Sequence, residues 1–335
     1  MTKALLPLLL SALCLALAGS FQQVAAETSE VLGFHGSGST AISNCMWYTM
    51  QSLNFQTKIA TYTTYRAVGS GTGISEFMGN ITHSYNDFGC ADFPLPKQDY
   101  DTLQNASQGM IHIPLVMGSV GVFNSLPIQQ PDASSTAQQL NVNLTGCLVA
   151  RIYQGEILDW THPDIVAINP NMNLPVQLDF YGNPKANQSF PMTIIYRNLG
   201  SGTTMIFTTY LYKICPQHWG IELVGDAIQW PITGKSYAIG VEGTASMVRV
   251  LQATPGAIGY SNTGLALQQG AQESALQMEQ TSLKQAFFLT SANAESKDGI
   301  AAAVNSATIP NSADADWSGV DVINKVQVSM KLFVV

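Results

Sequence analysis

Residues 197–204 (RNLGSGTT) combine the side chains and the backbone flexibility that bind an oxyanion without reacting with it. Arg197 offers a planar guanidinium that can donate two parallel hydrogen bonds, and Ser201 and Thr203 add hydroxyl donors. The two glycines let the backbone turn sharply before a helix, whose free N–H groups favour an anion by roughly 0.3–1 kcal/mol per charge. An ordinary strand-to-helix turn with a surface arginine remains the alternative from these residues alone.

The residues on either side of this turn predict the elements that position it. Residues 192–196 (MTIIY) form a short apolar, partly β-branched run that is typical of a buried strand. After the turn, apolar residues recur at the spacing of one helix face: Met205, Ile206, Phe207, Tyr210, Leu211 and Ile214. The expected helix therefore points its N-terminus back at the turn.

Two further glycine-rich turns repeat this arrangement earlier in the chain. Residues 35–40 (HGSGST) follow a strand-like run and precede a helical pattern over 41–53. Residues 66–73 (RAVGSGTG) follow a β-branched run and precede a helix expected to open at 74–78. Three such units in one chain indicate several helix N-termini that converge on one anion.

An acidic residue follows a fourth short strand. Asp92 ends the run 86–92 (NDFGCAD), and Pro94 and Pro96 prevent a helix from starting there. A carboxylate can only accept hydrogen bonds, so it repels sulfate but accepts a bond from an oxyanion that still carries a proton, such as mono- or dihydrogen phosphate. A plain carboxylate at a strand end is the alternative.

The other chemistries that glycine-rich turns suggest are not supported. The only Gly-Lys-Ser, at 234–236, has Gln229 where a phosphate-binding loop needs glycine, and Ile74 breaks a dinucleotide fingerprint. No serine has the flanking glycines of a hydrolase elbow, and the five histidines show no metal-ligand spacing. We expect no metal and no cofactor. Only Asp92 and His35 could serve as a base in a rival, phosphatase-like enzyme.

Composition points to an exported protein with two lobes. The 335 residues carry a net charge of −8, which argues against binding to nucleic acid or anionic membranes. Residues 1–26 resemble an export signal, with Lys3, an apolar run and a small-residue cleavage site, and no later stretch approaches about 20 apolar residues. We therefore expect a secreted or periplasmic protein that is not anchored in a membrane.

Taken together, the motifs resemble those of the periplasmic phosphate-binding proteins that serve the high-affinity phosphate ABC transporter. Six motifs occur in the family's order: 36–41 (GSGSTA), 69–73 (GSGTG), 87–95 (DFGCADFPL), Ile152 to Trp160 with Tyr153, Gly155 and Ile157, 197–203 (RNLGSGT) and 255–260 (PGAIGY). The resemblance implies a type II periplasmic-binding-protein-like α/β fold, with mixed sheets flanked by helices and a ligand cleft between two lobes.

The resemblance also implies which residues contact phosphate. The family's contacts fall on the Thr40 hydroxyl, the Ala41 backbone amide, Ser70, Asp92, Arg197, Ser201, Gly202 and Thr203, with Ser39 and Gly71 as further candidates. The sequence departs from the family at two positions. Leu199 stands where better-known members carry an acid that pairs with the arginine, and Ala41 stands where an aromatic residue is common.

The glycine-flanked apolar runs at 111–124 and 255–260 are expected to cross between the lobes. Lobe 1 would then be 27–117 plus 257–335, and lobe 2 would be 118–256. Family members continue beyond Trp317 with another strand and helices, so we expect an incomplete or diverged end of lobe 1.

Four cysteines remain after the signal, none at metal spacing, and in an exported chain they suggest disulfides. Among the three connectivities we favour Cys45–Cys90 and Cys147–Cys215, because each pair stays within one lobe.

The expected function is capture of inorganic phosphate by a monomer, for uptake or sensing, with an ABC transporter permease as a candidate partner. The alternatives are a phosphatase-like enzyme and a scaffold that no longer binds, both built on the same anion-binding turns.

Overall fold

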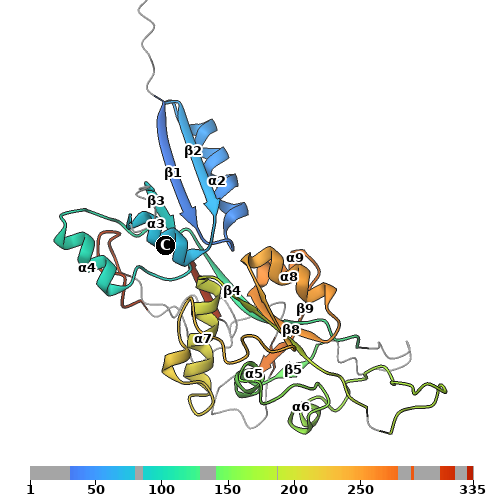
Figure 1. Ribbon diagram of the computed structural model, residues 1–335. Helices are drawn as coiled ribbons and strands as arrows, with labels where there is room; N and C mark the ends of the chain where they lie inside the picture. Colours follow the sequence, from blue (N-terminus) through green and yellow to red (C-terminus); the bar gives the residue numbers. More distant parts are fainter. Residues whose placement is uncertain are drawn as a thin grey trace, which may run out of the picture.

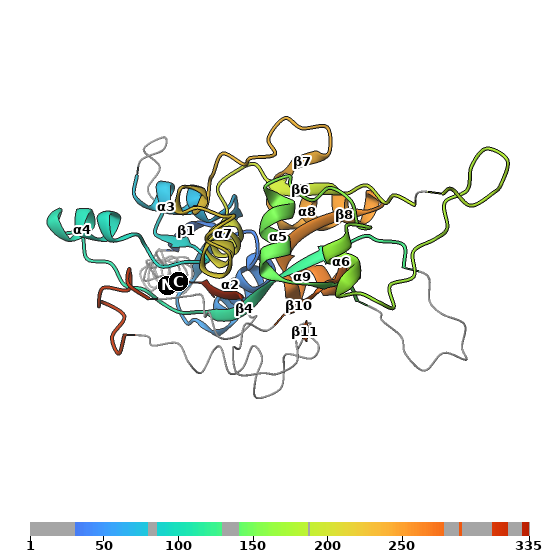
Figure 2. The same ribbon diagram turned by 90° about the horizontal axis from the view of Figure 1, so that it is seen from below.

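The structure is a computed structural model that describes residues 31–79, 86–128, 141–186, 188–277, 288–289, 310–320 and 330–334 (Figures 1 and 2). The predicted export signal at 1–26 lies outside these residues. The Ala-rich run near Ala301 also predicts a helix, and it too lies outside them. Among the residues described, no helix has the length and apolar character needed to cross a membrane. The predicted α/β fold is confirmed, with mixed sheets flanked by helices.

The first sheet contains the strands that lead into the N-terminal glycine-rich turns. Within the described residues its order is β2-β1-β3, and all three strands are parallel. Parallel strands place their carboxyl ends at one edge, so the turns that follow them lie together. The strands are β1 (Leu32–Gly38), β2 (Thr61–Ala67) and β3 (Phe88–Cys90), and the helices that follow are α2 (Ser43–Gln56), α3 (Ser70–Phe77) and α4 (Lys97–Asn105).

The second sheet contains the strand that leads into Arg197. In the described part of the chain its order is β12-β4-β8-β6-β7, with β9 also pairing β4, and it combines parallel and antiparallel neighbours. Its strands are β4 (Val116–Asn124), β6 (Thr193–Arg197), β7 (Ala238–Val241), β8 (Ala257–Asn262), β9 (Gln272–Glu273) and β12 (Met330–Val334).

Helices and a small third sheet complete the part built around this second sheet. The third sheet has the order β11-β10-β5 among the described residues. The remaining elements are β5 (Asn143–Leu144), α5 (Gly146–Tyr153), α6 (Pro163–Ala167), α7 (Gly202–Ile214), η1 (Ile221–Leu223), α8 (Gly243–Ala253), α9 (Thr263–Gln268), β10 (Ala275–Gln277) and β11 (Phe288–Leu289).

Helix α7 follows strand β6 of the second sheet in the chain and lies beside the elements of the first sheet. Figures 1 and 2 both place α7 between α3 and α5. Its apolar face is buried through Ile206, Phe207, Tyr210 and Leu211, as the helical spacing predicts. The helix begins at Gly202, so its N-terminus lies at the predicted anion-binding turn.

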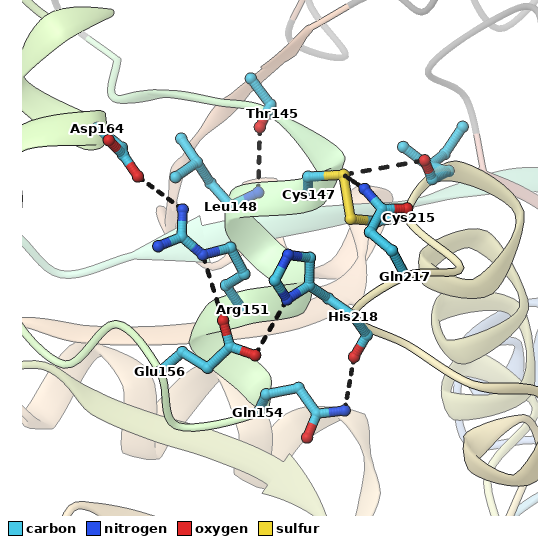
Figure 3. Close-up of a disulfide and its surroundings, with 11 residues drawn as sticks. Thr145, Cys147, Leu148, Arg151, Gln154, Glu156, Asp164, Cys215, Gln217 and His218 are labelled. Carbon is cyan, nitrogen blue, oxygen red and sulfur yellow. Dashed lines mark hydrogen bonds and ion pairs between the residues drawn. A yellow bond between two sulfur atoms is a disulfide. The ribbon is translucent and has the colours of Figure 1, made fainter.

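A disulfide fixes the other end of α7. Cys215 is the C-cap residue of α7 and is bonded to Cys147 in the first turn of α5, across a sequence separation of 68 (Figure 3). Arg151 of α5 also pairs with Glu156 at 3.3 Å and with Asp164 of α6 at 2.6 Å, which links α5 to α6. One of the two favoured disulfides is therefore present.

The other favoured disulfide was wrong. Cys45 and Cys90 are free thiols, Cys45 exposed and Cys90 buried. On α2 the residue that faces the core is Met46, and its neighbour Cys45 lies about 100° round the helix, towards solvent. Burial raises the pKa of the Cys90 thiol to about 12, so the thiol remains protonated in the core beside the first sheet.

The two glycine-flanked apolar runs, expected to be segments that cross between the lobes, contribute strands β4 and β8, which pair with each other. β4 and β8 are antiparallel neighbours, with Val122 opposite Tyr260, and β8 also pairs with β6. The division into lobes at 117/118 and 256/257 stays a prediction. The pairing of β8 with both β4 and β6 puts these strands into one sheet.

Candidate functional site

The turn after β1 brings Ser39 and its neighbours to the carboxyl end of the first sheet. The Ser39 N–H donates to the Cys90 carbonyl at 2.9 Å, and the Ala41 N–H donates to the Ser39 hydroxyl at 3.2 Å. Gly38 has φ 148°, and a Cβ there would lie 2.0 Å from the Cys90 carbonyl oxygen. Only glycine lets β1 and β3 approach this closely before the turn.

The turn after β2 packs against the turn after β1. The Gly69 N–H donates to the Gly38 carbonyl at 2.8 Å, and Ser70, which is 1% exposed, starts α3. The helix thus begins four residues earlier than the predicted start at Ile74. Gly73 lies inside α3. A Cβ at this position would meet the Gly38 Cα at 2.4 Å, so close packing against β1, and not a loop, requires glycine here.

Asp92 lies in the middle of this group and is 1% exposed. Its backbone N–H donates to the Ser70 hydroxyl at 3.3 Å, and its Oδ2 accepts from the Thr203 hydroxyl at 3.5 Å. Its Oδ1 is buried without a hydrogen-bond partner. Burial raises the Asp92 pKa to about 6, against the opposing effects of the nearby Ser39 hydroxyl and the Arg197 charge. Oδ1 of Asp92 can therefore accept a hydrogen bond from a further donor.

Arg197 ends β6 and comes from the second sheet. It is 5% exposed, and its Nε is buried without a partner. Burial lowers the pKa of the guanidinium, while the charges of Asp92 and Glu242 act in the opposite direction. A guanidinium remains charged over the working pH range, so this site holds a buried cation with an uncommitted donor.

The first turn of α7 joins the two groups. The Ser201 hydroxyl accepts from the Thr204 N–H at 3.4 Å and caps the helix. A Cβ at Gly202 would lie 2.4 Å from the Asp92 Cβ and 2.6 Å from the Ser70 hydroxyl oxygen. The N-termini of α3 and α7 therefore meet at Asp92, with contributions from both sheets.

A fourth strand–glycine–helix turn was missed in the sequence. β7 leads through Glu242 and Gly243, at φ 72°, into α8. Thr244 is 2% exposed, its hydroxyl lies 2.9 Å from the Thr40 hydroxyl, and its N–H donates to the same oxygen at 3.3 Å. The run 238–244 (AIGVEGT) shows the apolar strand and glycine that would have revealed it.

The remaining candidate residues have other surroundings. The Thr40 hydroxyl is bonded to Thr244, and Gly71 lies where α3 meets Asp226, whose Oδ2 would be 2.4 Å from a Cβ there. Leu199 is 49% exposed. His35, considered as a base, is exposed, and its ring is hydrogen-bonded to Thr64 at 2.8 Å. Among the described residues no group of three or more His, Cys, Asp or Glu could hold a metal ion.

Helix N-termini, hydroxyl groups, one buried cation and one buried acid with a high pKa thus converge from two sheets. This combination, in which hydrogen-bond donors and one acid from two parts of an α/β fold face one another, is typical of proteins that bind a small anion. The family comparison agrees with that class. A family model described as PBP superfamily domain matches residues 23–317, and the chain therefore belongs to the PBP superfamily.

Curated relatives and solved structures resemble the chain over most of its length. It is 30% identical over 263 residues to the phosphate-binding protein PstS of Xylella fastidiosa, covering 78% of this chain and 61% of the relative. It is 31% identical over 198 residues to PstS of Haemophilus influenzae, covering 59% and 49%. The chain thus spans between about half and three-fifths of the length of these relatives.

Solved structures support the fold. A high affinity periplasmic phosphate-binding protein (PfluDING) bound with phosphate has a TM-score of 0.57 at 20% identity, covering 91% of this chain and 78% of that one. A phosphate-binding protein from Stenotrophomonas maltophilia has a TM-score of 0.51 at 16% identity, with the same coverage. These likenesses concern the fold alone.

Proposed function

We propose that the chain binds inorganic phosphate, as the mono- or dihydrogen ion, at the meeting point of α3, α7 and Asp92. The observation that carries the proposal is the pair of buried groups without partners, Oδ1 of Asp92 and Nε of Arg197, which come from different sheets. Leaving such groups unpaired costs roughly 1–3 kcal/mol each, and one ligand with both an acceptor oxygen and a proton would satisfy both.

The ligand contacts are proposed residue by residue. Arg197 and the hydroxyls of Thr40, Ser70, Ser201 and Thr203 donate to phosphate oxygens, together with the N–H groups of Ala41 and Gly202. Ser39 and Gly71 are further candidates. Asp92 accepts the ligand's proton. Glu242 supplies charge near Arg197, where Leu199 does not.

The wider role is also a proposal. The names of the relatives support phosphate capture, and the predicted signal at 1–26 supports a site outside the cytoplasm. Delivery to an ABC transporter permease, a monomeric state, and binding without catalysis complete the proposal. Incubation with a chromogenic phosphate ester, with and without divalent metals, separates binding from phosphatase activity.

The test is a titration of the purified 27–335 chain with phosphate and with sulfate, followed by intrinsic tryptophan fluorescence. Trp230 is a suitable reporter because its Nε1 donates to the Arg197 carbonyl at 3.0 Å. We expect a saturable response to phosphate and none to sulfate. A folded chain without a phosphate response would contradict the proposal.

The Asp92→Asn variant tests the selectivity mechanism. The amide can donate a hydrogen bond, so sulfate is no longer faced by an oxygen that only accepts. We expect the preference for phosphate over sulfate to fall by about 10–100-fold, in line with roughly 1–3 kcal/mol for an unsatisfied buried group. Unchanged selectivity would remove Asp92 from the mechanism.

A further inference from the structure

The guanidinium of Arg197 has no carboxylate close enough to hold it. The position two residues later is Leu199, and no ion pair of Arg197 occurs within the described residues. Asp92 and Glu242 act on its charge only at longer range. The orientation of this buried cation must therefore come from its backbone and its packing.

The backbone of Arg197 is held on both sides by aromatic side chains. Its N–H donates to the Tyr260 hydroxyl at 3.2 Å, and its carbonyl accepts from Nε1 of Trp230 at 3.0 Å. Next along the chain, the Asn198 N–H donates to the Val241 carbonyl at 3.2 Å. The end of β6 is thus fixed by β8 and by the Trp230 side chain as well as by its neighbour β7.

The same Tyr260 hydroxyl also reaches the start of α7. It lies 2.6 Å from the hydroxyl of Thr204, whose N–H is bonded to the capping Ser201. A phenol has one donor and two lone pairs, so it can accept from Arg197 and also bond Thr204. One oxygen atom therefore connects the two ends of the 198–203 turn, which carries the proposed anion donors Ser201, Gly202 and Thr203.

The Tyr260 ring cannot easily move this oxygen away. Tyr260 is 1% exposed, and its ring stacks on Phe207 of α7 with centroids 4.2 Å apart and planes 6° apart. Further contacts come from Tyr153 and Trp230, each 5.9 Å from the Tyr260 centroid. Close packing keeps buried side chains in one rotamer, so the hydroxyl position is set by the core.

We propose that Tyr260 is a positioning residue for the proposed phosphate site, fixing the distance between Arg197 and the N-terminus of α7 through its hydroxyl. The inference rests on the proposed function. A turn held at both ends binds an anion without first having to be ordered, and this preorganisation raises the affinity. In this role Tyr260 holds the backbone of Arg197 in place, whereas Leu199 has no carboxylate that could hold its guanidinium.

The variant that tests this is Tyr260→Phe, which keeps the ring and removes the hydroxyl. Tyr153→Phe is the matched control, because the Tyr153 hydroxyl is also buried and donates to β6, at the Ile195 carbonyl, 3.1 Å away. Each variant loses one buried tyrosine hydrogen bond to β6, and Tyr260→Phe also loses the bond to the Thr204 hydroxyl. Only the first loses a bond at the anion-binding turn.

Two measurements follow. In titrations with inorganic phosphate we expect the Kd of Tyr260→Phe to rise by about tenfold, because the buried hydrogen bonds that hold the turn are lost, and that of Tyr153→Phe to stay within about twofold. In the ligand-free chain, hydrogen exchange of the amides at 197 and 201–204 should be faster in Tyr260→Phe than in Tyr153→Phe.

The exchange measurement separates this inference from the proposed function, since it needs no ligand. Equal exchange at the turn in both variants would overturn the inference, as would an equal change in Kd. If the wild-type chain gave no phosphate response while Tyr260→Phe still accelerated exchange at 197–204, the proposed ligand would be wrong and the positioning by Tyr260 would stand.

Discussion

The part of the molecule around β6 and β8 is held by aromatic packing, and the part around β1 is held by polar contacts. In the former, Trp230 packs between Tyr153, Trp219 and Tyr260 at centroid distances of 5.5–5.9 Å. The disulfide from Cys147 and the ion pairs of Arg151 fix the helices outside this cluster. The largest fully buried side chains, such as Trp160 and Trp219, also belong to this part.

The part around β1 has a different interior. Glu76 is buried and bonded to Ser37, Asn86 and Arg66, the last at 2.5 Å. Burial acts to raise the Glu76 pKa, but these hydrogen bonds outweigh it and lower the pKa. A cavity of about 570 Å³ lies between α2, β3 and 109–115, lined by apolar side chains such as Met46 and Phe77.

The proposed site combines the two kinds of region. Arg197 and the first turn of α7 come from the aromatic part, whereas Asp92 and Ser70 come from the polar part. Dense burial raises the free energy of local opening, and few buried apolar contacts lower it. We therefore expect the Arg197 side to be fixed before the ligand arrives and the Asp92 side to adjust to it.

The largest effect that tests this difference is loss of the disulfide. Closing a loop of this length contributes about 4 kcal/mol in the chain-entropy description. Cys147→Ser should lower the free energy of unfolding by that order, measured by urea denaturation, and should accelerate hydrogen exchange in α5 and α7 more than in β1. Cys45→Ser, which removes an exposed free thiol, is the control and should change little. Equal acceleration in α7 and β1 would mean that the two parts open as one unit.

A smaller effect comes from the acid in the polar part. The folded-state pKa of Asp92 is about 6, above the ordinary value of about 3.9, so the folded ligand-free chain binds this proton more tightly than the unfolded chain. This contribution to stability is fully present below about pH 4 and is lost as the pH rises through 6. It amounts to about 3 kcal/mol at most.

Urea unfolding at pH 4 and pH 7 checks this prediction. From pH 4 to pH 7 the free energy of unfolding of the wild-type chain should fall by the contribution of Asp92. In Asp92→Asn the fall should be smaller by up to about 3 kcal/mol. Glu222→Gln, at an exposed position in η1, should behave like the wild type. If Asp92→Asn shows the same pH dependence as the wild type, the buried carboxyl does not titrate in this range.

The smallest effect concerns the contact between the parts. Gly202→Ala would bring a methyl group within 2.4 Å of the Asp92 Cβ, where no flexible side-chain end can give way. Overpacking of this kind costs about 1–3 kcal/mol, so we expect phosphate affinity to fall by about 10–100-fold in the fluorescence titration. Gly109→Ala, with nothing within 4 Å of its Cβ position, is the control. Unaltered affinity in Gly202→Ala would show that the two parts bind phosphate without this contact.

Local pattern in the sequence determined the elements that carry the site. The β-branched runs, the glycine-rich turns and the helical spacing after Ser201 predicted β1, β2, β6 and α7, because strand and helix periodicity depend on neighbouring residues. Asp92 and Arg197 predicted an anion site for a different reason. The hydrogen-bonding capacity of a carboxylate and a guanidinium does not depend on the fold.

Only the tertiary structure decided how these elements meet. The sequence did not show that α3 begins at Ser70, that Thr244 bonds Thr40, or that Cys45 faces solvent while Cys90 is buried. It also did not show that one hydroxyl, that of Tyr260, connects Arg197 with Thr204. Each of these depends on contacts between residues far apart in the chain. Periodicity gives the face of an element, and only packing against the rest of the fold decides what that face touches.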